Sequence, residues 1–371
     1  MKKLIILLYS AFLFLFTIFS YLFVDPNLSY LKDFYSGFAF SNRLLTTISY
    51  TTAILIFFIF YGIFIYLGVK KKINLKEIFV LLSITAAILF FSYPAMLSYD
   101  IFNYIATSKV LFFYQENPYV VMPIEFVGDP LLAFTHAANK IALYAPFWLL
   151  LTGAPYLFGF GNFIVILFSF KLFSVLFYLG TVFLVWKISR NILSLILFAL
   201  NPLVIIETLV SGHNDIVMIF LVLLSFFLLA KKKIFLGTIF FILSILIKYS
   251  TILLIPVFLY VVWRLIKNKG IDWEKVYFSS SLLMLVAFLL SPIREEIYPW
   301  YAIWFISFSF LVPNKKILLY TSIAFSFSLL LRYVPYMFTG TYMGQTPFMK
   351  EIISFIPPAL VFLYYVIKKK I

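Results

Sequence analysis

A carboxylate, Asp100, stands directly after the third long apolar run of the chain. A carboxylate where a helix leaves a membrane can stay ionised at the water boundary and still reach a lipid-borne substrate, as a general base for an acceptor hydroxyl must. Asp is also a favoured N-cap residue, so Asp100 could instead cap a juxtamembrane helix. Neighbouring polar and aromatic residues are candidates for substrate binding: Tyr99, Asn103, Tyr104, Asn117 and Tyr119.

A second polar group interrupts a later apolar run, where Glu207 is followed by His213, Asn214 and Asp215. A carboxylate inside an apolar run is costly enough to count as a functional hypothesis. These side chains could bind sugar hydroxyls, or His213 and Asp215 could bind a divalent cation such as Mg²⁺ or Mn²⁺ that orients a phosphate. Two ligands at this spacing are weak grounds for a metal, and a polar turn between two helices is the alternative.

Basic residues embedded in apolar runs form a third group, namely Lys171, Lys248 and Arg332. A lipid phosphate is negatively charged at the headgroup level, so Arg or Lys could hold it and stabilise the charge on a leaving phosphate. Lys248 and Arg332 could instead snorkel toward the interface. That alternative suits Lys171 less well, because we expect it about two turns inside its helix.

The loop 291–301 mixes both charge signs with aromatic residues. It adds Arg294 as another candidate for phosphate binding, and Trp300 and Tyr301 as rings that could stack on a sugar. Trp and Tyr are also common at a membrane interface, so the aromatic residues of this loop are expected even if it binds no ligand.

The amino-acid composition indicates that these residues belong to an integral membrane protein. Of 371 residues, 64% are hydrophobic and 12% are charged, which excludes a soluble globule with a charged surface. The apolar runs are long enough for helices that cross about 30 Å of hydrocarbon. Because lipid cannot satisfy backbone polar groups, we expect an all-α helical bundle as a single domain over residues 1–371. The chain has no cysteine, so disulfides, thiolate metal sites and cysteine nucleophiles are excluded.

The net charge of +15 comes largely from short lysine clusters between apolar runs. Short basic loops stay cytoplasmic, so topology explains these clusters better than a nucleic-acid partner does. With the clusters inside, about twelve crossings follow, with both termini cytoplasmic and an uncleaved first helix. The predicted crossings are 4–24, 44–68, 78–97, 163–186, 192–210, 215–230, two within a hairpin at 234–263, 276–291, 300–312, 317–333 and 351–367.

This layout places the segment 98–160 outside the cytoplasm, with 146–160 lying along the outer interface as a juxtamembrane helix. Pro146, Pro155 and Trp148 suit such a helix. Most carboxylates, including Asp25, Asp100 and Glu296, then fall near the extracytoplasmic face. Acidic residues contribute little to orientation, so a site on that face explains their distribution better than topology does.

The order of these motifs resembles the GT-C superfamily of polytopic glycosyltransferases, and most closely its polyprenyl-phosphate-mannose-dependent mannosyltransferases. The resemblance rests on the stretch from Asp100 to Tyr119, Tyr144-Ala145-Pro146, Asn201-Pro202 with Glu207 and Gly212-His213-Asn214-Asp215, Leu246-Ile247-Lys248, and Pro299-Trp300-Tyr301. It implies that Asp100 is the catalytic carboxylate, that 130–160 forms juxtamembrane helices, and that transfer occurs outside the cytoplasm with inversion and without a nucleotide-sugar donor.

We therefore expect an inverting glycosyltransferase in the plasma membrane, with its active site on the extracytoplasmic face. Its expected partners are membrane lipids, a polyprenyl- or dolichyl-phosphate sugar, mannose above all, and a glycolipid or glycan acceptor. The alternative is a transporter or flippase of lipid or sugar, and a weaker one is a non-catalytic assembly or polymer-ligase component. Transporter folds bind near the midplane with internal repeats and broken helices, and this sequence has no convincing repeat.

Overall fold

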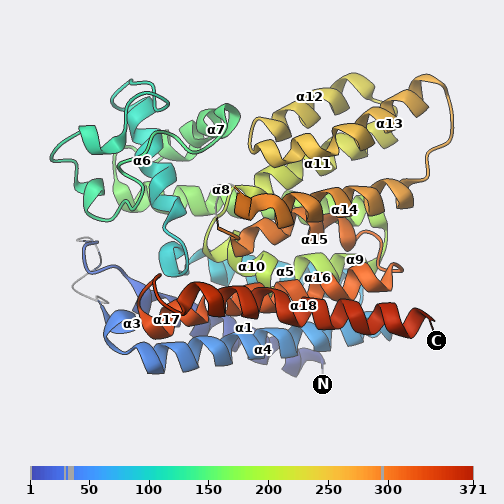
Figure 1. Ribbon diagram of the computed structural model, residues 1–371, viewed down its shortest axis with the longest axis horizontal. Helices are drawn as coiled ribbons and strands as arrows, with labels where there is room; N and C mark the ends of the chain where they lie inside the picture. Colours follow the sequence, from blue (N-terminus) through green and yellow to red (C-terminus); the bar gives the residue numbers. More distant parts are fainter. Residues whose placement is uncertain (1, 29–30, 32–36, 294–295, 371) are drawn as a thin grey trace.

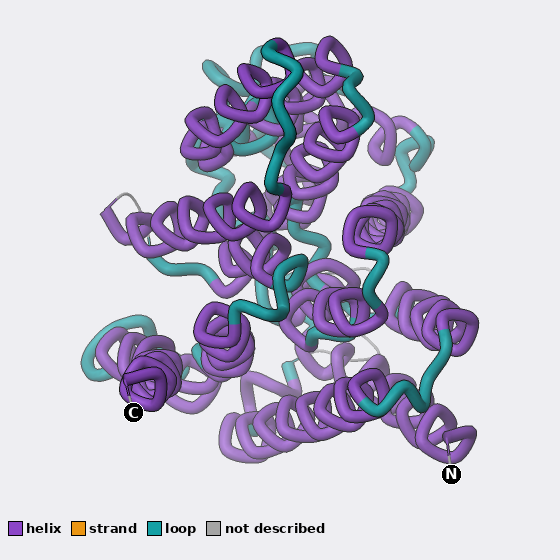
Figure 2. Tube along the Cα trace, turned by 90° about the vertical axis from the view of Figure 1, so that its right-hand side faces the viewer, coloured by secondary structure: helices purple, strands orange, loops and turns teal. Residues whose placement is uncertain are grey.

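The computed structural model describes residues 2–28, 31, 37–293 and 296–370. It is 76% helical, and the described residues contain no strand. The longer helices run side by side along the long axis of the molecule (Figure 1). Figure 2 is turned by 90° and looks along several of these helices. The predicted all-α fold is confirmed.

Among the described residues, seven helical stretches are long and apolar enough to cross a membrane. A bent pair of helices brings the number to eight if it counts as one span, so the predicted count of about twelve crossings is not confirmed. The seven stretches are α1 (Lys2–Ser20) with η1 (Tyr21–Phe23), α4 (Arg43–Val69), α8 (Phe163–Ser189), η6 (Tyr249–Leu254) with α13 (Ile255–Ile266), α14 (Trp273–Leu290) with η7 (Ser291–Ile293), α16 (Lys316–Leu331) with α17 (Val334–Thr339), and α18 (Thr346–Lys370).

The bent pair joins α9 (Ile192–Ala199) to α10 (Pro202–Ile205) and the π-helix η5 (Ile206–Val210), with an angle of 52° at the break. Pro202 has no N–H and fits the first turn of a new helix, and Asn201 caps that helix by accepting from the amides of Leu203 and Val204. The Asn201 amide also donates to Ser326 Oγ at 3.0 Å, which ties the break to α16.

Shorter helices occupy the other predicted crossings: α5 (Leu75–Phe90), α11 (Asp215–Ala230), α12 (Ile234–Ile245) and α15 (Ile303–Ser309). The crossing expected at 300–312 consists only of η8 (Pro299–Ala302), α15 and a turn. Seven residues of α-helix rise about 10 Å, too little to cross the hydrocarbon alone. The hairpin expected at 234–263 is present as α12, η6 and α13, with Lys248 at its turn.

The segment 98–160 folds into short helices joined by loops and covers one end of the bundle (Figure 1). It contains α6 (Asp100–Phe112), η3 (Pro123–Glu125), η4 (Pro130–Ala133) and α7 (Pro146–Leu157). The amide of Phe147 donates to the carbonyl of Leu246 at 3.0 Å, which joins the start of α7 to the hairpin turn. Two further short helices lie near this end, α3 (Phe38–Ser41) and η2 (Pro94–Met96).

The centre of the fold is the stretch from the end of α9 into α11. Every residue from 194 to 219 is buried. This stretch contains Glu207, His213 and Asp215, so the second polar group of the sequence lies in the core rather than on a wetted surface. Buried charges need partners, and those partners define the site described below.

Candidate functional site

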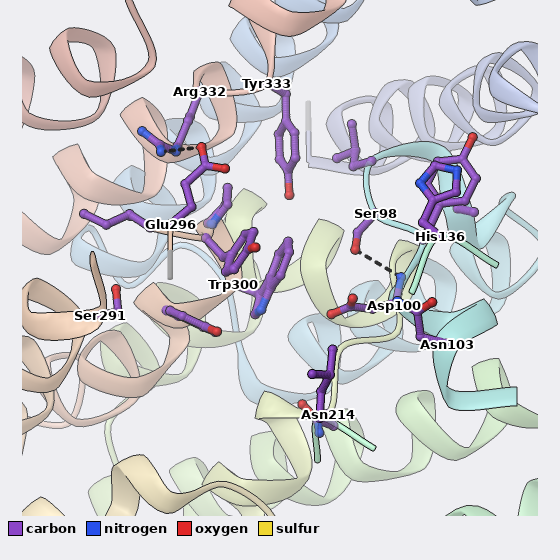
Figure 3. A pocket seen from close by; sticks show the side chains of 18 of the residues that line it. Ser98, Asp100, Asn103, His136, Asn214, Ser291, Glu296, Trp300, Arg332 and Tyr333 are labelled. Carbon is purple, nitrogen blue, oxygen red and sulfur yellow. Dashed lines mark hydrogen bonds and ion pairs between the residues drawn. The ribbon is translucent and has the colours of Figure 1, made fainter. Parts of the chain in front are cut away.

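A cavity of about 1090 Å³ opens where α1, α4, α14 and α16 end beside the start of α6. Figure 3 shows Ser98, Asp100 and Asn103 on one side of it and Arg332 with Glu296 on the other, with Trp300 and Tyr333 between them. The hairpin turn adds Ile247 and Lys248 to the wall, and α18 adds Lys350. Segments far apart in the sequence therefore meet around one hollow.

Asp100 is the first residue of α6, and its backbone amide donates to Ser98 Oγ at 3.3 Å. The N-cap of α6 is Tyr99, which makes no side-chain cap, so the alternative of Asp100 as the N-cap residue is not what the structure has. A carboxylate in the first turn is still favoured by the helix dipole. The Asp100 side chain is 27% exposed and lines the cavity.

Behind Asp100 lies a chain of buried polar groups. His213 Nδ1 is 3.4 Å from Asp100 Oδ2, and His213 Nε2 is 3.3 Å from Glu207 Oε2. Tyr333 donates its hydroxyl to the other oxygen of Glu207 at 3.0 Å. The His213 and Glu207 side chains are fully buried, whereas Asp100 reaches the cavity. The imidazole therefore lies between two carboxylates, and only that of Asp100 reaches the cavity.

Local backbone geometry produces this arrangement. Glu207 lies in η5, a π-helical turn of the kind often found at functional sites. Gly212 follows with φ +72°, a left-handed conformation that other residues rarely adopt, and the next amide, that of His213, donates to the carbonyl of Glu207 at 3.0 Å. The chain thus turns back so that His213 and Glu207 face each other.

The His213 ring is held from its side by an aromatic stack. Trp300 lies parallel to it with ring centroids 3.7 Å apart, and Tyr298 lies parallel to Trp300 at 4.6 Å. The His213 and Tyr298 rings would collide if both lay on the same face of the Trp300 indole. They therefore lie on opposite faces, and both faces of Trp300 are covered. The prediction that Trp300 stacks on a sugar ring is therefore not supported by its position.

Burial lowers the pKa of His213, but the contacts with Asp100 and Glu207 outweigh it and raise the pKa to about 9. The imidazole is therefore a cation at neutral pH. Glu207 and His213 are closed off from the cavity, so neither can bind sugar hydroxyls in this conformation, contrary to the sequence prediction. Asn214 alone of this group lines the cavity.

Asp215 is paired with the hairpin turn rather than with a ligand. Lys248 Nζ is 2.9 Å from Asp215 Oδ1, and the indole N–H of Trp304 donates to the same oxygen. The ammonium also lies over the Tyr301 ring, 4.3 Å from its centroid, and Tyr301 stacks on Trp304. Lys248 and Tyr301 line the cavity, while Asp215 is fully buried.

The opposite wall carries two cations around one carboxylate. Arg332 Nη2 is 2.7 Å from Glu296 Oε1, and Lys350 Nζ contacts the same oxygen. Arg332 also donates to Ser354 Oγ at 3.0 Å, which links α16 to α18. All three charged side chains line the cavity. Arg294, the other predicted cation of this region, lies outside the described residues.

Several cavity residues were not among the predicted site residues: Asp25, Arg43, His136, Lys140, Glu296, Tyr333 and Lys350. Asp25 and Glu296 were expected near the same face, but without a role of their own. Asp25 could have been found, because it follows the first apolar helix as Asp100 follows the third. Its carboxylate accepts from Tyr99 Oη at 2.9 Å, and Tyr99 stacks on His136 with centroids 3.8 Å apart. Tyr99 and Asn103, which the sequence suggested as substrate-binding residues, also line the cavity.

Other predicted binding residues lie away from the cavity wall. Lys171 is buried and donates to the carbonyls of Leu89 and Ser92, where it caps the end of α5, so its position does not support phosphate binding. Tyr104 is buried against Asn214. The Asn117 and Tyr119 side chains make hydrogen bonds within the 98–160 segment.

Within the described parts of the chain, no group of three or more His, Asp or Glu side chains has a spacing that could hold a metal ion. The His213 nitrogens face two carboxylates, and Asp215 Oδ1 already binds Lys248. A divalent cation at this site would have to displace these partners, and it stays a prediction that transfer assays with EDTA or added Mg²⁺ and Mn²⁺ can decide.

Residues 24–264 match the family model of the alpha-(1->6)-mannopyranosyltransferase N-terminal domain, the MptA_B family. The chain belongs to this family. No curated protein and no solved structure matches it. Membership makes the chain a glycosyltransferase of the mannosyltransferase class, which confirms the predicted GT-C resemblance and favours an enzyme over a transporter or flippase.

The matched region of this mannosyltransferase contains Asp100, the Glu207–Asp215 group and Lys248. The cavity is completed by residues beyond the match, because Glu296, Arg332 and Lys350 form its opposite wall. The candidate active site therefore combines the part of the chain that defines the family with the helices that follow it.

Proposed function

We propose that this mannosyltransferase moves mannose from a polyprenyl-phosphate donor to a hydroxyl of a glycolipid or glycan, with inversion at the anomeric carbon. The observation that carries the proposal is the partly exposed Asp100 carboxylate on the wall of a 1090 Å³ cavity. A base that must meet a substrate proton needs this combination of access and fixed position. The family description suggests an α-1,6 linkage as the product.

In the proposed step, Asp100 accepts the proton of the acceptor hydroxyl while the hydroxyl oxygen bonds to the anomeric carbon. The bond between that carbon and the phosphate oxygen breaks, and its electron pair stays on the lipid phosphate. Attack opposite to the leaving group inverts the configuration. The proton then passes from Asp100 to solvent through the open side of the cavity, which restores the carboxylate.

The donor phosphate is best placed beside Arg332 and Lys350. These two cations contact one carboxylate, Glu296, so the three groups together retain positive charge. Lys248 is paired one to one with the buried Asp215, which leaves it less able to neutralise a phosphate. Arginine can also bind phosphate through two parallel N–H groups. Arg332, with Lys350, is therefore the proposed holder of the leaving phosphate.

The distribution of charges supports an extracytoplasmic active site. Several helices carry a cavity residue at one end and a basic residue or cluster at the other, and basic loops stay cytoplasmic. The pairs at the two ends of each helix are Arg43 and Lys70–Lys72 for α4, Leu290 and Lys275 for α14, Arg332 and Lys316 for α16, and Lys350 and Lys368 for α18, where Lys70–Lys72 and Arg332 directly follow the last helical residue. On this basis, we propose that the protein lies in the plasma membrane, with the cavity and the segment 98–160 on the extracytoplasmic side.

Purified protein in nanodiscs, supplied with polyprenyl phosphomannose and a mannose-terminated glycolipid, tests the proposal. We expect release of polyprenyl phosphate and one new anomeric signal, whose one-bond carbon–proton coupling reports the configuration. GDP-mannose in place of the lipid donor should give no transfer. Transfer from GDP-mannose alone, or retention of the donor's configuration, would contradict the proposed donor or mechanism.

A further inference from the structure

We propose that His213 is a positioning residue for Asp100, acting as a buried imidazolium that fixes and counterbalances the Asp100 and Glu207 carboxylates without touching substrate. This inference rests on the proposed role of Asp100 as base. It assigns a fully buried imidazole beside the cavity to positioning the base rather than to sugar or metal binding.

Geometry separates this role from direct substrate contact. The His213 side chain has no exposed surface, and Asp100 stands between it and the cavity. Its two nitrogens each face one carboxylate at 3.3–3.4 Å, longer than an ordinary hydrogen bond but within reach of an ion pair. Catalytic contacts are often long in the absence of substrate and shorten when it binds.

The surroundings hold the imidazole in one orientation. Trp300 stacks on the ring at 3.7 Å with 18° between the planes, and the backbone turn at Gly212 fixes the start of the side chain. Glu207 is held in turn by the Tyr333 hydroxyl. A ring with its face and both nitrogens constrained can keep an Asp100 oxygen in a fixed position on the cavity wall, as an oriented base requires.

Charge balance gives the second argument. Two carboxylates flank His213, and Glu207 has no exposure to water that could compensate its charge. A buried carboxylate without a cation is strongly disfavoured, so removing the imidazolium would favour protonation within the group. The other titratable groups nearby are Tyr333 and Tyr50 beside Glu207, Tyr104 beside Asn214, and the ion pair of Asp215 with Lys248.

The decisive experiment measures kcat/KM against pH with polyprenyl phosphomannose and a glycolipid acceptor. For the wild-type protein, we expect activity to fall as pH rises through about 9, where His213 loses its proton. In His213→Gln, kcat should fall on the order of 10²-fold with KM values within about threefold, and the alkaline fall near pH 9 should disappear. A merely structural histidine would change protein yield or thermal stability but not this pH profile.

Glu207→Gln supplies a second, directional readout. The Glu207 carboxylate is one of the two contacts that raise the pKa of His213, so its removal should move the alkaline fall of activity to lower pH. His136→Gln is the matched control, because the chain has only two histidines and burial lowers the pKa of His136. Whatever its rate, His136→Gln should keep the alkaline fall near pH 9.

The proposal is overturned if His213→Gln keeps the alkaline fall, or if Glu207→Gln leaves its midpoint unchanged while remaining folded. Folding is checked by gel filtration and by thermal unfolding of each variant in detergent. Failure of the proposed function looks different: Asp100→Asn would then retain transfer. Should Asp100→Asn be inactive while His213→Gln behaves as wild type, only the positioning role fails.

Discussion

Lys248 and Asp215 form an ion pair of 2.9 Å between the hairpin turn and the start of α11, with the carboxylate fully buried and the ammonium at the cavity wall. The Trp304 indole shares the same carboxylate oxygen. The pair therefore fixes the hairpin against the core at the place where Lys248 and Tyr301 reach the cavity. Its energetic importance can be measured by removing one charge at a time.

Lys248→Met should lower the free energy of unfolding by about 3–5 kcal/mol, because it leaves a buried carboxylate without its cation. The double variant Lys248→Met with Asp215→Asn should recover most of that loss, since no buried charge remains. Thermal and denaturant unfolding in detergent measure both effects. Equal destabilisation of the single and double variants would show that the pair is not coupled in this way.

Arg332→Ala should raise the KM for the lipid donor about tenfold or more, because it removes the cation proposed to hold the phosphate. Glu296→Gln should leave that KM unchanged or lower it, since it frees Arg332 and Lys350 from their shared carboxylate. Arg264→Ala is the control, because Arg264 binds the Gly270 carbonyl away from the cavity. An unchanged donor KM in Arg332→Ala would remove Arg332 from the phosphate site.

Lys171→Met should destabilise the protein by about 1–3 kcal/mol, because the carbonyls of Leu89 and Ser92 lose their donor in the interior. Donor KM should stay within about twofold of the wild-type value, since Lys171 does not line the cavity. Unfolding curves and donor titrations separate the two effects. A large rise in donor KM with unchanged stability would return Lys171 to the phosphate site.

The chain has no cysteine, so single introduced cysteines report topology directly. Val127→Cys, at a side chain 93% exposed within the segment 98–160, should react with a membrane-impermeant maleimide in intact cells. Lys269→Cys, in the basic loop between α13 and α14, should react only after the membrane is opened. The reverse pattern would place the cavity on the cytoplasmic side and contradict the proposed site of transfer.

The sequence predicted much of the fold because apolar runs of membrane length and their basic ends are strong local signals. Asp100, Lys248 and Arg332 were chosen as candidate site residues because each is a charge in or beside an apolar run, and all three line the cavity, whereas their roles stay predictions. The sequence did not distinguish spanning helices from short ones, since the stretch 300–312 is as apolar as a crossing although its α-helix has only seven residues.

What the sequence could not predict was which polar residues meet. Glu207 and His213 looked like sugar or cation ligands, but a π-helical turn and Gly212 direct them toward each other and bury them. Trp300 was predicted to stack on a sugar ring, but Tyr298 and His213 cover its two faces. Such contacts depend on how distant segments pack together, and the spacing of residues within one segment does not reveal this packing.

Asp100→Asn, assayed for mannose transfer from polyprenyl phosphomannose, shows whether Asp100 is the base. We predict a loss of at least about 10³-fold in kcat with an unchanged thermal midpoint, because the amide cannot accept the acceptor's proton. Asp25→Asn is the matched carboxylate on the same cavity, bonded to Tyr99, and should retain more activity. Transfer by folded Asp100→Asn within tenfold of the wild-type rate would rule out Asp100 as the base.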